Sequence, residues 1–299
     1  IHYRPHIAIL NNLEFDHADI FRDLEDVKRS FAYFLRVVPK SGKVLLNGDD
    51  ANLQSLLPVD WTEVVSVGTD ARNQLRIINF KDAVEGSSFE LHWQGDRWAT
   101  VSWELHGLYN ARNAAMGALA AAFAMGFEDP KAFQLDSLKS FKGVQRRQDA
   151  LWETAELSVL EDFAHHPTAI AGALEGLRAA YPKHQIHACF EPRSHTATQS
   201  LFQADFTKAL SGADRVSLGV VHRAERIAVE ERLDVEAIAE ELEAGGVSAR
   251  SYCANLDLLQ DLKMDLKASE IPTLVVFFTN GAFDGIQHAL VESLSECGA

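Results

Sequence analysis

The chain has 299 residues, of which 47% are hydrophobic and 24% charged, and its formal net charge is -15. This composition is that of a globular protein and excludes disordered or fibrous material, and the length predicts two domains. The negative charge argues against a general nucleic-acid-binding surface, because clustered lysine and arginine residues hold phosphate backbones.

The cysteines Cys189, Cys253 and Cys297 are far apart and show no CxxC spacing, which suits a reducing cytosol better than a disulfide framework. No signal peptide is recognisable, and no apolar run approaches the roughly 20 residues of a membrane helix. We therefore expect a soluble, cytoplasmic protein with no membrane partner. The chain begins at Ile1, without a methionine and without the features of a domain start, so we expect a fragment of a longer protein.

The first elements alternate between strand and helix. Residues 7–10 form a short apolar run, which predicts a buried strand leading into the polar loop 11–17. Apolar residues keep helical spacing over 19–38, until Pro39 and Gly42 stop the helix. A second strand is predicted at 44–46, followed by a turn cluster at 47–50 and a short helix.

Between Trp61 and Leu105 the pattern changes to short β runs separated by turns, which predicts a small antiparallel patch. The predicted strands are 64–67, 74–80, 88–93 and 98–104, with a hairpin turn at 94–96. An alanine-rich helix is predicted at 111–125, ended by Gly126. Asn110 and Asn113 are three residues apart and so lie on one face of its first turn.

The second half of the chain alternates regularly between strand and helix. The predicted strands are near 157–161, 185–190, 215–221, 247–252 and 273–278, each followed by a helical segment. Such alternation predicts parallel βαβ units and a doubly wound sheet. We therefore expect domains at 1–142 and 143–299, with residues 141–168 as a hinge.

Polar side chains follow four of these five strands, where open α/β sheets bind their ligands. The polar strand ends are 162–166, 191–196, 222–223 and 279–285.

Several candidates also have structural alternatives. His166 and Pro167 could simply begin a helix, since proline is favoured at the first helical position. Asp162 could cap a loop, and Asn110 could cap a helix. His17 could be a hydrogen-bonded loop histidine, and Arg146 and Arg147 could be surface charges.

Four motifs in this order resemble the Mur ligase family, the ATP-dependent amide-bond-forming enzymes of bacterial cell-wall synthesis. They are Asn-Asn-Leu-Glu-Phe-Asp-His at 11–17, Gly-x-x-Asn-x-x-Asn-Ala-Ala at 107–115, Phe-x-Gly-Val-x-Arg-Arg at 141–147 and Asp-Phe-Ala-His-His-Pro-Thr at 162–168. The resemblance covers essentially the whole chain. It implies an α/β fold: the latter part of a central ATP-binding domain with a small antiparallel β patch, then a Rossmann-like C-terminal domain with a mostly parallel sheet.

The resemblance also implies ATP and Mg²⁺ as cofactors, with a carboxylate activated as an acyl phosphate and then attacked by an amine. His17 matches a family histidine that helps bind magnesium, and Arg147 an arginine that reaches the nucleotide; both would take part in catalysis. The other matched nucleotide-binding positions are Asn110 and Asn113 near the adenine, Asp162 near the ribose, and His165. We expect Arg147 and Asp162 to lie in a solvent-filled crevice.

Within the family, residues 11–21, 190–196 and 280–283 are most similar to members that join the tripeptide L-Ala-γ-D-Glu-meso-diaminopimelate to UDP-N-acetylmuramate in peptidoglycan recycling. By analogy, the incoming peptide is expected at Arg193, Ser194, Asn280 and Phe283. The alternatives are a family member that adds L-alanine to the same UDP-sugar, a non-catalytic Rossmann-like binding module, and a metal hydrolase using His17, His165 and His166.

The chain also departs from the family pattern. It has no Gly-x-x-Gly-Lys-Thr phosphate loop, since Ser41-Gly42-Lys43 lacks the glycine spacing and opens a strand. We expect that loop, the first magnesium-binding carboxylate and a UDP-binding domain before Ile1, so the chain alone should be inactive. Tyr109 replaces the histidine usual before the first asparagine. Near Phe31 the helix offers an aromatic residue where several members carry a carbamylated lysine.

Overall fold

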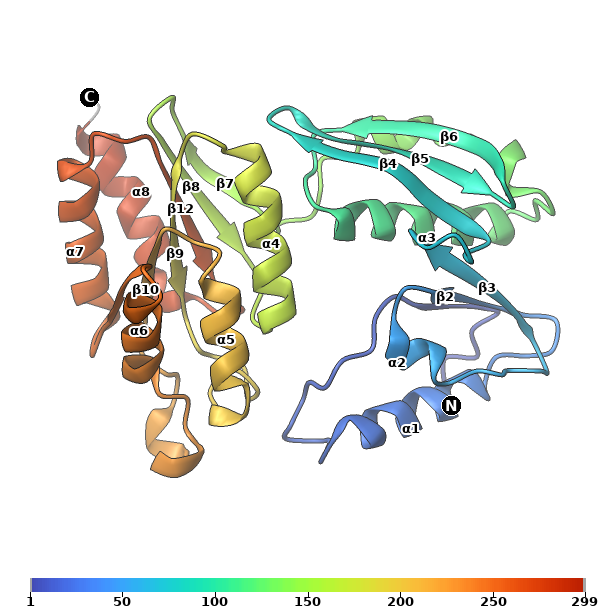
Figure 1. The fold of residues 1–299 in the computed structure, drawn as a ribbon, viewed down its shortest axis with the longest axis horizontal. Helices are drawn as coiled ribbons and strands as arrows, with labels where there is room; N and C mark the ends of the chain where they lie inside the picture. The colour runs from blue at the N-terminus through green and yellow to red at the C-terminus, as the bar shows by residue number, and fades with distance from the viewer. Residues whose placement is uncertain (1, 298–299) are drawn as a thin grey trace. The chain divides into compact units, whose positions relative to one another are not determined.

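The structure, a computed structural model, describes residues 2–297. The chain divides into two compact units, with the boundary between Lys142 and Gly143. Each unit contains one six-stranded sheet (Figure 1). Both sheets are mostly parallel and flanked by helices, so the predicted α/β class is confirmed.

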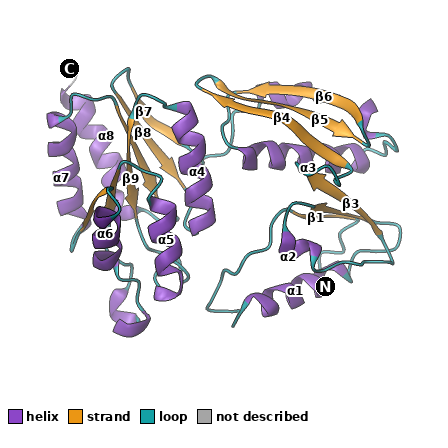
Figure 2. Cartoon of the chain, in the orientation of Figure 1, coloured by secondary structure: helices purple, strands orange, loops and turns teal. Residues whose placement is uncertain are grey.

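The sheet of the first unit has the strand order β1-β2-β3-β4-β5-β6, and Figure 2 shows β4, β5 and β6 side by side at its far end. Its strands are β1 (Ile7–Leu10), β2 (Lys43–Asn47), β3 (Glu63–Gly68), β4 (Leu75–Ala83), β5 (Gly86–Trp93) and β6 (Asp96–Trp103). The pairs from β1 to β4 are parallel, whereas β4, β5 and β6 pair antiparallel. The predicted antiparallel patch is therefore confirmed.

Helices cover both faces of the parallel part. They are α1 (Leu24–Leu35), α2 (Ala51–Gln54) and α3 (Leu108–Ala124), and the short 3-10 turns η1 (Pro130–Ala132) and η2 (Asp136–Ser140) follow. Successive residues of β2 alternate between two cores: Val44 packs in the cluster that includes α1, and Leu45 in the cluster that includes α3. This alternation is what a strand buried on both faces requires.

Helix α3 begins at Leu108, three residues earlier than predicted, because a carboxylate from β4 holds its start. Asp82 accepts the backbone N–H of Gly107 (2.7 Å) and bonds to Nδ1 of His106 (2.8 Å). Gly107 takes the N-cap position with φ +87°, without a capping side chain of its own. Asn110 is therefore not the N-cap, and its amide donates to the His106 carbonyl (2.7 Å).

Replacing Asp82 by alanine is expected to destabilise the first unit by about 1–3 kcal/mol, since two donors at the start of α3 lose their acceptor. Urea denaturation followed by circular dichroism measures this. Glu85→Gln, at an exposed position in the adjacent turn, should change stability by less than about 0.5 kcal/mol. Equal stability of the two variants would contradict the role of Asp82.

The sheet of the second unit has the order β11-β10-β9-β12-β8-β7. Its strands are β7 (Asp149–Glu153), β8 (Leu157–Asp162), β9 (Gln185–Phe190), β10 (Arg215–Leu218), β11 (Ser248–Ser251) and β12 (Thr273–Phe278). The five predicted strands form its parallel part. The sequence did not predict β7, which pairs antiparallel with β8 at one edge.

The helices of this unit form a layer on each face of the sheet (Figure 1). They are α4 (Pro167–Ala180), α5 (Gln203–Leu210), α6 (Val235–Ala244), α7 (Asn255–Ala268) and α8 (Ile286–Cys297). Helices α4, α5 and α6 contribute to one core and α7 and α8 to the other. Short 3-10 turns lie in the connecting loops, η3 (Ser200–Phe202), η4 (Ala224–Arg226), η5 (Val229–Glu231) and η6 (Phe283–Gly285).

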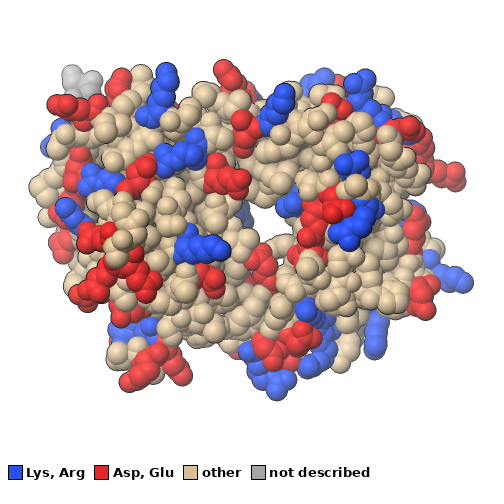
Figure 3. Space-filling model, in the orientation of Figure 1, with Lys and Arg blue, Asp and Glu red and all other residues tan. Residues whose placement is uncertain are grey.

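Two surface properties bear on function. Within residues 2–297, no helix has the combination of length and apolar character that crossing a membrane would require. On the face drawn in Figure 3, basic and acidic side chains are interspersed, and no broad basic patch is visible. This agrees with the net charge of -15.

Candidate functional site

In the first unit, three asparagines join α3 to the carboxyl ends of β1 and β2. Asn11 donates to Oδ1 of Asn113 (2.5 Å), and Asn47 donates to the Asn11 carbonyl (2.9 Å). Asn113 is exposed in the first turns of α3. The structure therefore fixes Asn113 at the carboxyl edge of the sheet, where open α/β sheets bind ligands.

Asp49, just after β2, organises the same edge. Its carboxylate accepts the backbone N–H and hydroxyl of Thr69 (2.7 and 2.9 Å), the N–H of Asp70 (3.1 Å) and the amide of Asn73 (2.8 Å). It also pairs with Arg112 of α3 (3.3 Å). Partial burial raises the pKa of Asp49, but these hydrogen bonds outweigh it and the pKa lies below its usual value. The sequence showed only a turn cluster here.

Replacing Asp49 by asparagine should cost about 1.5–3 kcal/mol of stability at pH 7, the range for hydrogen bonds to a charged group. A lowered folded pKa stabilises the protein above the unfolded pKa of about 3.9, and this contribution is lost as pH falls through the folded value. The stability difference between wild type and Asp49→Asn should therefore shrink from pH 7 to pH 3.

Urea denaturation at several pH values checks this prediction. Asp60 is exposed and supplies the matched Asp→Asn control. A difference between wild type and Asp49→Asn that stays constant with pH would contradict the charged role of Asp49.

His17 lies in the loop after β1, and its side chain is 66% exposed. Its backbone N–H donates to Oδ1 of Asp16 (2.7 Å), and its Nε2 lies 3.9 Å from Oδ2 of the same residue. Within the described part of the chain, no three His, Cys, Asp or Glu residues gather as a metal site. Magnesium prefers oxygen ligands in sixfold coordination, so Asp16 and His17 fit only part of such a shell.

In the second unit, the neighbouring arginines of the 141–147 motif have different environments. The Arg146 guanidinium donates to the carbonyls of Thr279 (3.1 Å) and Gly281 (2.5 Å) and pairs with buried Glu161 (3.0 Å). Arg147 is exposed, and its guanidinium carbon lies 5.4 Å from the centre of the Phe163 ring. Arg146 thus holds residues 143–148, the linker that leads into β7, to the end of β12, whereas Arg147 faces solvent.

Asp162, at the end of β8, is only 3% exposed, so the expected position in a solvent-filled crevice is wrong. Its two oxygens accept the backbone N–H groups of Ala164 (2.7 Å) and Gln148 (3.0 Å). Burial raises the pKa of Asp162, opposed by these hydrogen bonds and by the charge of Arg147. The carboxylate therefore ties the linker that carries Arg147 to the end of β8.

The two histidines after Asp162 also differ. His166 occupies the N-cap position of α4 and Pro167 its first turn, which confirms their structural alternative. His165 is half-buried, with Nδ1 at 3.0 Å from the Phe163 carbonyl and its ring edge-on to Phe163. Arg147 and His165 thus contact the same aromatic ring, over which the Arg146 guanidinium also lies (5.2 Å).

The ends of β9 and β12 are joined by Glu191, a carboxylate that is 2% exposed. It accepts the Thr279 hydroxyl and the N–H of Phe283 (3.2 Å), and it pairs with Arg193 (3.3 Å). Arg193 in turn lies across Gly281, where a Cβ would stand 2.0 Å from Cδ of Arg193. Sequence reasoning did not single out Glu191; a carboxylate at the end of a buried strand was the available signal.

The predicted peptide-contact residues fall into two groups. Arg193 and Asn280 are half-buried, and within the described chain Oδ1 of Asn280 has no hydrogen-bond partner. Ser194 closes a turn by accepting the N–H of Ala197 (3.0 Å). Phe283 is a correction: its side chain is completely buried and packs edge-on against Phe277 (5.9 Å). Its ring belongs to the core and cannot contact a peptide in this structure.

The loop after β10 lies beside Arg193, because the backbone N–H of His222 donates to the Pro192 carbonyl (2.9 Å). Burial lowers the pKa of His222, and so do the charges of Arg193 and Arg223, while Glu191 and Asp284 oppose this shift. Asp284 accepts the amide of Asn255 (2.8 Å). Asn255 also accepts the N–H of Val220 (3.0 Å). The loops after β9 and β10, which carry Arg193 and Arg223, therefore lie near a carboxylate that follows β12, an arrangement suited to a zwitterionic ligand.

Known proteins resemble nearly the whole chain in sequence. Residues 1–122 match the Mur ligase middle domain. The UDP-N-acetylmuramate–L-alanyl-γ-D-glutamyl-meso-2,6-diaminoheptandioate ligase of Escherichia coli is 33% identical over 299 residues, covering 99% of this chain and 61% of that protein. The chain thus spans about three fifths of that relative's length.

Two solved structures are similar over nearly the whole chain. A murein peptide ligase from Psychrobacter arcticus has a TM-score of 0.65 and 25% identity, covering 98% of this chain and 58% of that one. A UDP-N-acetylmuramate-alanine ligase from Thermotoga maritima has a TM-score of 0.74 and 19% identity, covering 99% and 61%. With the domain match and the 33% identity, these findings show that the chain belongs to the Mur ligase family.

Proposed function

We propose that the full-length protein is a cytoplasmic, ATP-dependent ligase that joins L-Ala-γ-D-Glu-meso-diaminopimelate to UDP-N-acetylmuramate in peptidoglycan recycling. The observation that carries this proposal is the 33% identity, over 99% of the chain, to the E. coli ligase named for that reaction. On this reading, the first unit is the latter part of the central ATP-binding domain and the second is the C-terminal ligase domain.

The first unit offers groups suited to an adenine. Asn110 uses its amide N–H and Asn113 its amide oxygen in the contacts described above. Within the described residues, no partner occupies the Asn110 oxygen or the Asn113 NH₂ group, which leaves one acceptor and one donor on the same helical face. An adenine edge presents the complementary pair, an amino donor and a ring-nitrogen acceptor.

Amide formation from a carboxylate requires activation, and we propose an acyl phosphate formed with ATP. The exposed guanidinium of Arg147 is suited to bind phosphate oxygens, because arginine presents a fork of donors, and Asp162 and His165 position it near the nucleotide. When bound, Mg²⁺ would offset phosphate charge; Asp16 and His17 are the residues of this chain proposed to contact it.

The proposed peptide contacts are Arg193, Ser194 and Asn280, whereas the buried ring of Phe283 is excluded. A diaminopimelate residue carries carboxylate and ammonium groups, so both the basic groups near Arg193 and the carboxylate of Asp284 have partners in such a substrate. L-Alanine also carries one carboxylate and one ammonium group, but the tripeptide carries further carboxylates, so it offers more partners to the basic groups near Arg193. Together with the 33% identity to the E. coli ligase, this favours the tripeptide over L-alanine as the amine substrate.

ADP release by the full-length protein, with UDP-N-acetylmuramate and either the tripeptide or L-alanine, tests the proposal. ADP release that depends on the tripeptide is expected. Release with L-alanine alone would favour the alternative ligase. Release with neither, in the presence of ATP and magnesium, would overturn the ligase reading and favour a non-catalytic binding module.

A further inference from the structure

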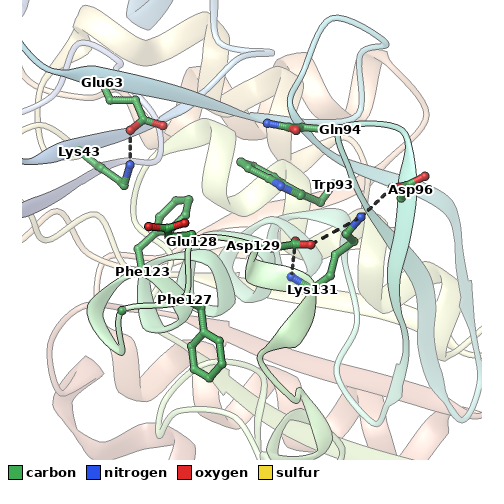
Figure 4. A pocket seen from close by; sticks show the side chains of 11 residues that line it. Lys43, Glu63, Trp93, Gln94, Asp96, Phe123, Phe127, Glu128, Asp129 and Lys131 are labelled. Atoms are coloured by element: carbon green, nitrogen blue, oxygen red, sulfur yellow. Dashed lines mark hydrogen bonds and ion pairs between the residues drawn. The ribbon is translucent and has the colours of Figure 1, made fainter.

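The first unit contains a cavity of about 610 Å³ that none of the proposed ligands uses. It lies where β2 and β3 begin and where α3 ends, at the sheet edge opposite Asn11 and Asp49. Its walls also include the end of β5 and the loop after α3 (Figure 4). A volume of this size falls in the range of small-molecule sites, about 300–1,000 Å³.

The lining is acidic. Carboxylates outnumber lysines, with Glu63, Asp96, Glu128 and Asp129 against Lys43 and Lys131. Lys43 pairs with Glu63, while Lys131 pairs with Asp96 (2.6 Å) and lies 3.8 Å from Asp129. Among the described residues Glu128 has no ion-pair partner, and it is exposed. The uncompensated charge of the cavity is therefore negative.

Helix α3 adds to this negative potential. Its carboxyl end reaches the cavity through Phe123, and its last turn contains no basic residue. The carboxyl end of a helix carries a partial negative charge that favours cations. The carboxyl end of α3 and the carboxylates thus both favour a positively charged ligand.

The aromatic walls are suited to the same kind of ligand. Trp93 and Phe123 pack edge-to-face at 6.0 Å, and Phe127 lies nearby on the following loop. The Lys43 ammonium already stands 4.8 Å from the centre of the Phe123 ring, so the ring face holds a cation in this environment.

Trp93 supplies a second, independent observation. Its side chain is more than nine-tenths buried (7% exposed) and lines the cavity between the two ion pairs (Figure 4). No acceptor in the described part of the chain bonds to its indole N–H, and the nitrogen keeps some contact with solvent. A ligand in the cavity that carries a hydrogen-bond acceptor can therefore bond to it.

We propose that this cavity is a binding site for a small organic cation, an amine whose body packs on aromatic rings and which carries one hydrogen-bond acceptor. The ammonium group binds beside Glu128 and the carboxyl end of α3, and the acceptor bonds to the indole of Trp93. The site is separate from the proposed nucleotide residues, and its occupation does not depend on the ligase function.

Tyramine is a suitable probe, because it combines an ammonium group, a ring and a hydroxyl. 4-Ethylphenol and 3-(4-hydroxyphenyl)propionate keep the ring and hydroxyl but are neutral and anionic. Titration of the 299-residue chain by NMR should give tyramine a Kd of about 1–10 mM, as expected for a ligand of this size at low efficiency. The neutral and anionic analogues should bind about threefold more weakly, which is the loss expected when one exposed ion pair is removed.

Variants locate the site. Glu128→Gln removes an exposed charge without disturbing the core and should weaken tyramine about threefold, and Trp93→Phe should weaken all three probes by removing the donor. Glu104→Gln, the same change at an exposed residue that pairs with Lys142 outside the cavity, is the control. Equal binding of the three probes, unchanged tyramine binding by Glu128→Gln, or no tyramine binding at 20 mM would each overturn the proposal.

Discussion

Replacing Arg147 by alanine in the full-length protein is expected to lower kcat/KM for ATP by about 10²–10³, the usual loss when one donor to a reacting charge is removed. Because Arg147 is exposed and stacks on Phe163, its loss should change stability by less than about 0.5 kcal/mol. Steady-state ADP release and urea denaturation measure the two effects separately.

Arg146→Ala is the matched comparison, since it removes the same side chain from the adjacent position. It deprives two carbonyls of their donor and leaves the 5%-exposed Glu161 without its cation. Breaking such a pair costs about 3–5 kcal/mol, so this variant should lose stability first. Full ATP use by Arg147→Ala, or equal loss of stability in both variants, would contradict the assignment.

The sequence predicts the bounds of strands best where nearly every residue of the strand is buried. Strands β9 and β12 match their predicted bounds and β8 ends one residue later, because each is an apolar run bounded by polar residues. Strand β7 was missed because none of its residues is fully buried. As an antiparallel edge strand it carries no continuous apolar signal.

The site was predicted less well, because its contacts join residues distant in sequence. Arg146 and Arg147 carry the same sequence signal, and only the structure separates them, with Arg146 at φ +58° turned toward the end of β12. Asp162 was predicted in solvent because its donors, Gln148 and Ala164, are backbone groups that no sequence pattern marks. Phe283 follows a strand within a polar loop, which made a core residue look like a ligand contact.

The structural roles of three carboxylates were missed for the same reason, because their hydrogen-bond donors come from distant parts of the sequence. Asp49, Asp82 and Glu191 each bind backbone or side-chain donors from separate segments. Glu191 is buried and Asp49 and Asp82 are partly buried. Burying a carboxylate is costly unless several donors satisfy it, so each of the three marks a point where loops are held in fixed positions. In the second unit, that point lies beside Arg193.

Replacing Glu191 by alanine is expected to cost about 3–5 kcal/mol, because it removes one partner of a buried ion pair. The Thr279 hydroxyl and the Phe283 N–H lose their acceptor together with Arg193. Glu191→Gln keeps the shape and one acceptor oxygen, so it should retain most of the stability but hold Arg193 less firmly.

That difference separates a positioning role from a purely structural one. In the full-length protein, Glu191→Gln is expected to raise KM for the tripeptide several-fold while KM for ATP stays unchanged, since Arg193 is proposed to bind the peptide and Arg147 the nucleotide. Glu175→Ala, at an exposed position on α4, controls for loss of surface charge. A parallel rise in both KM values would show that Glu191 supports the unit as a whole, and unchanged values would remove Arg193 from the peptide site.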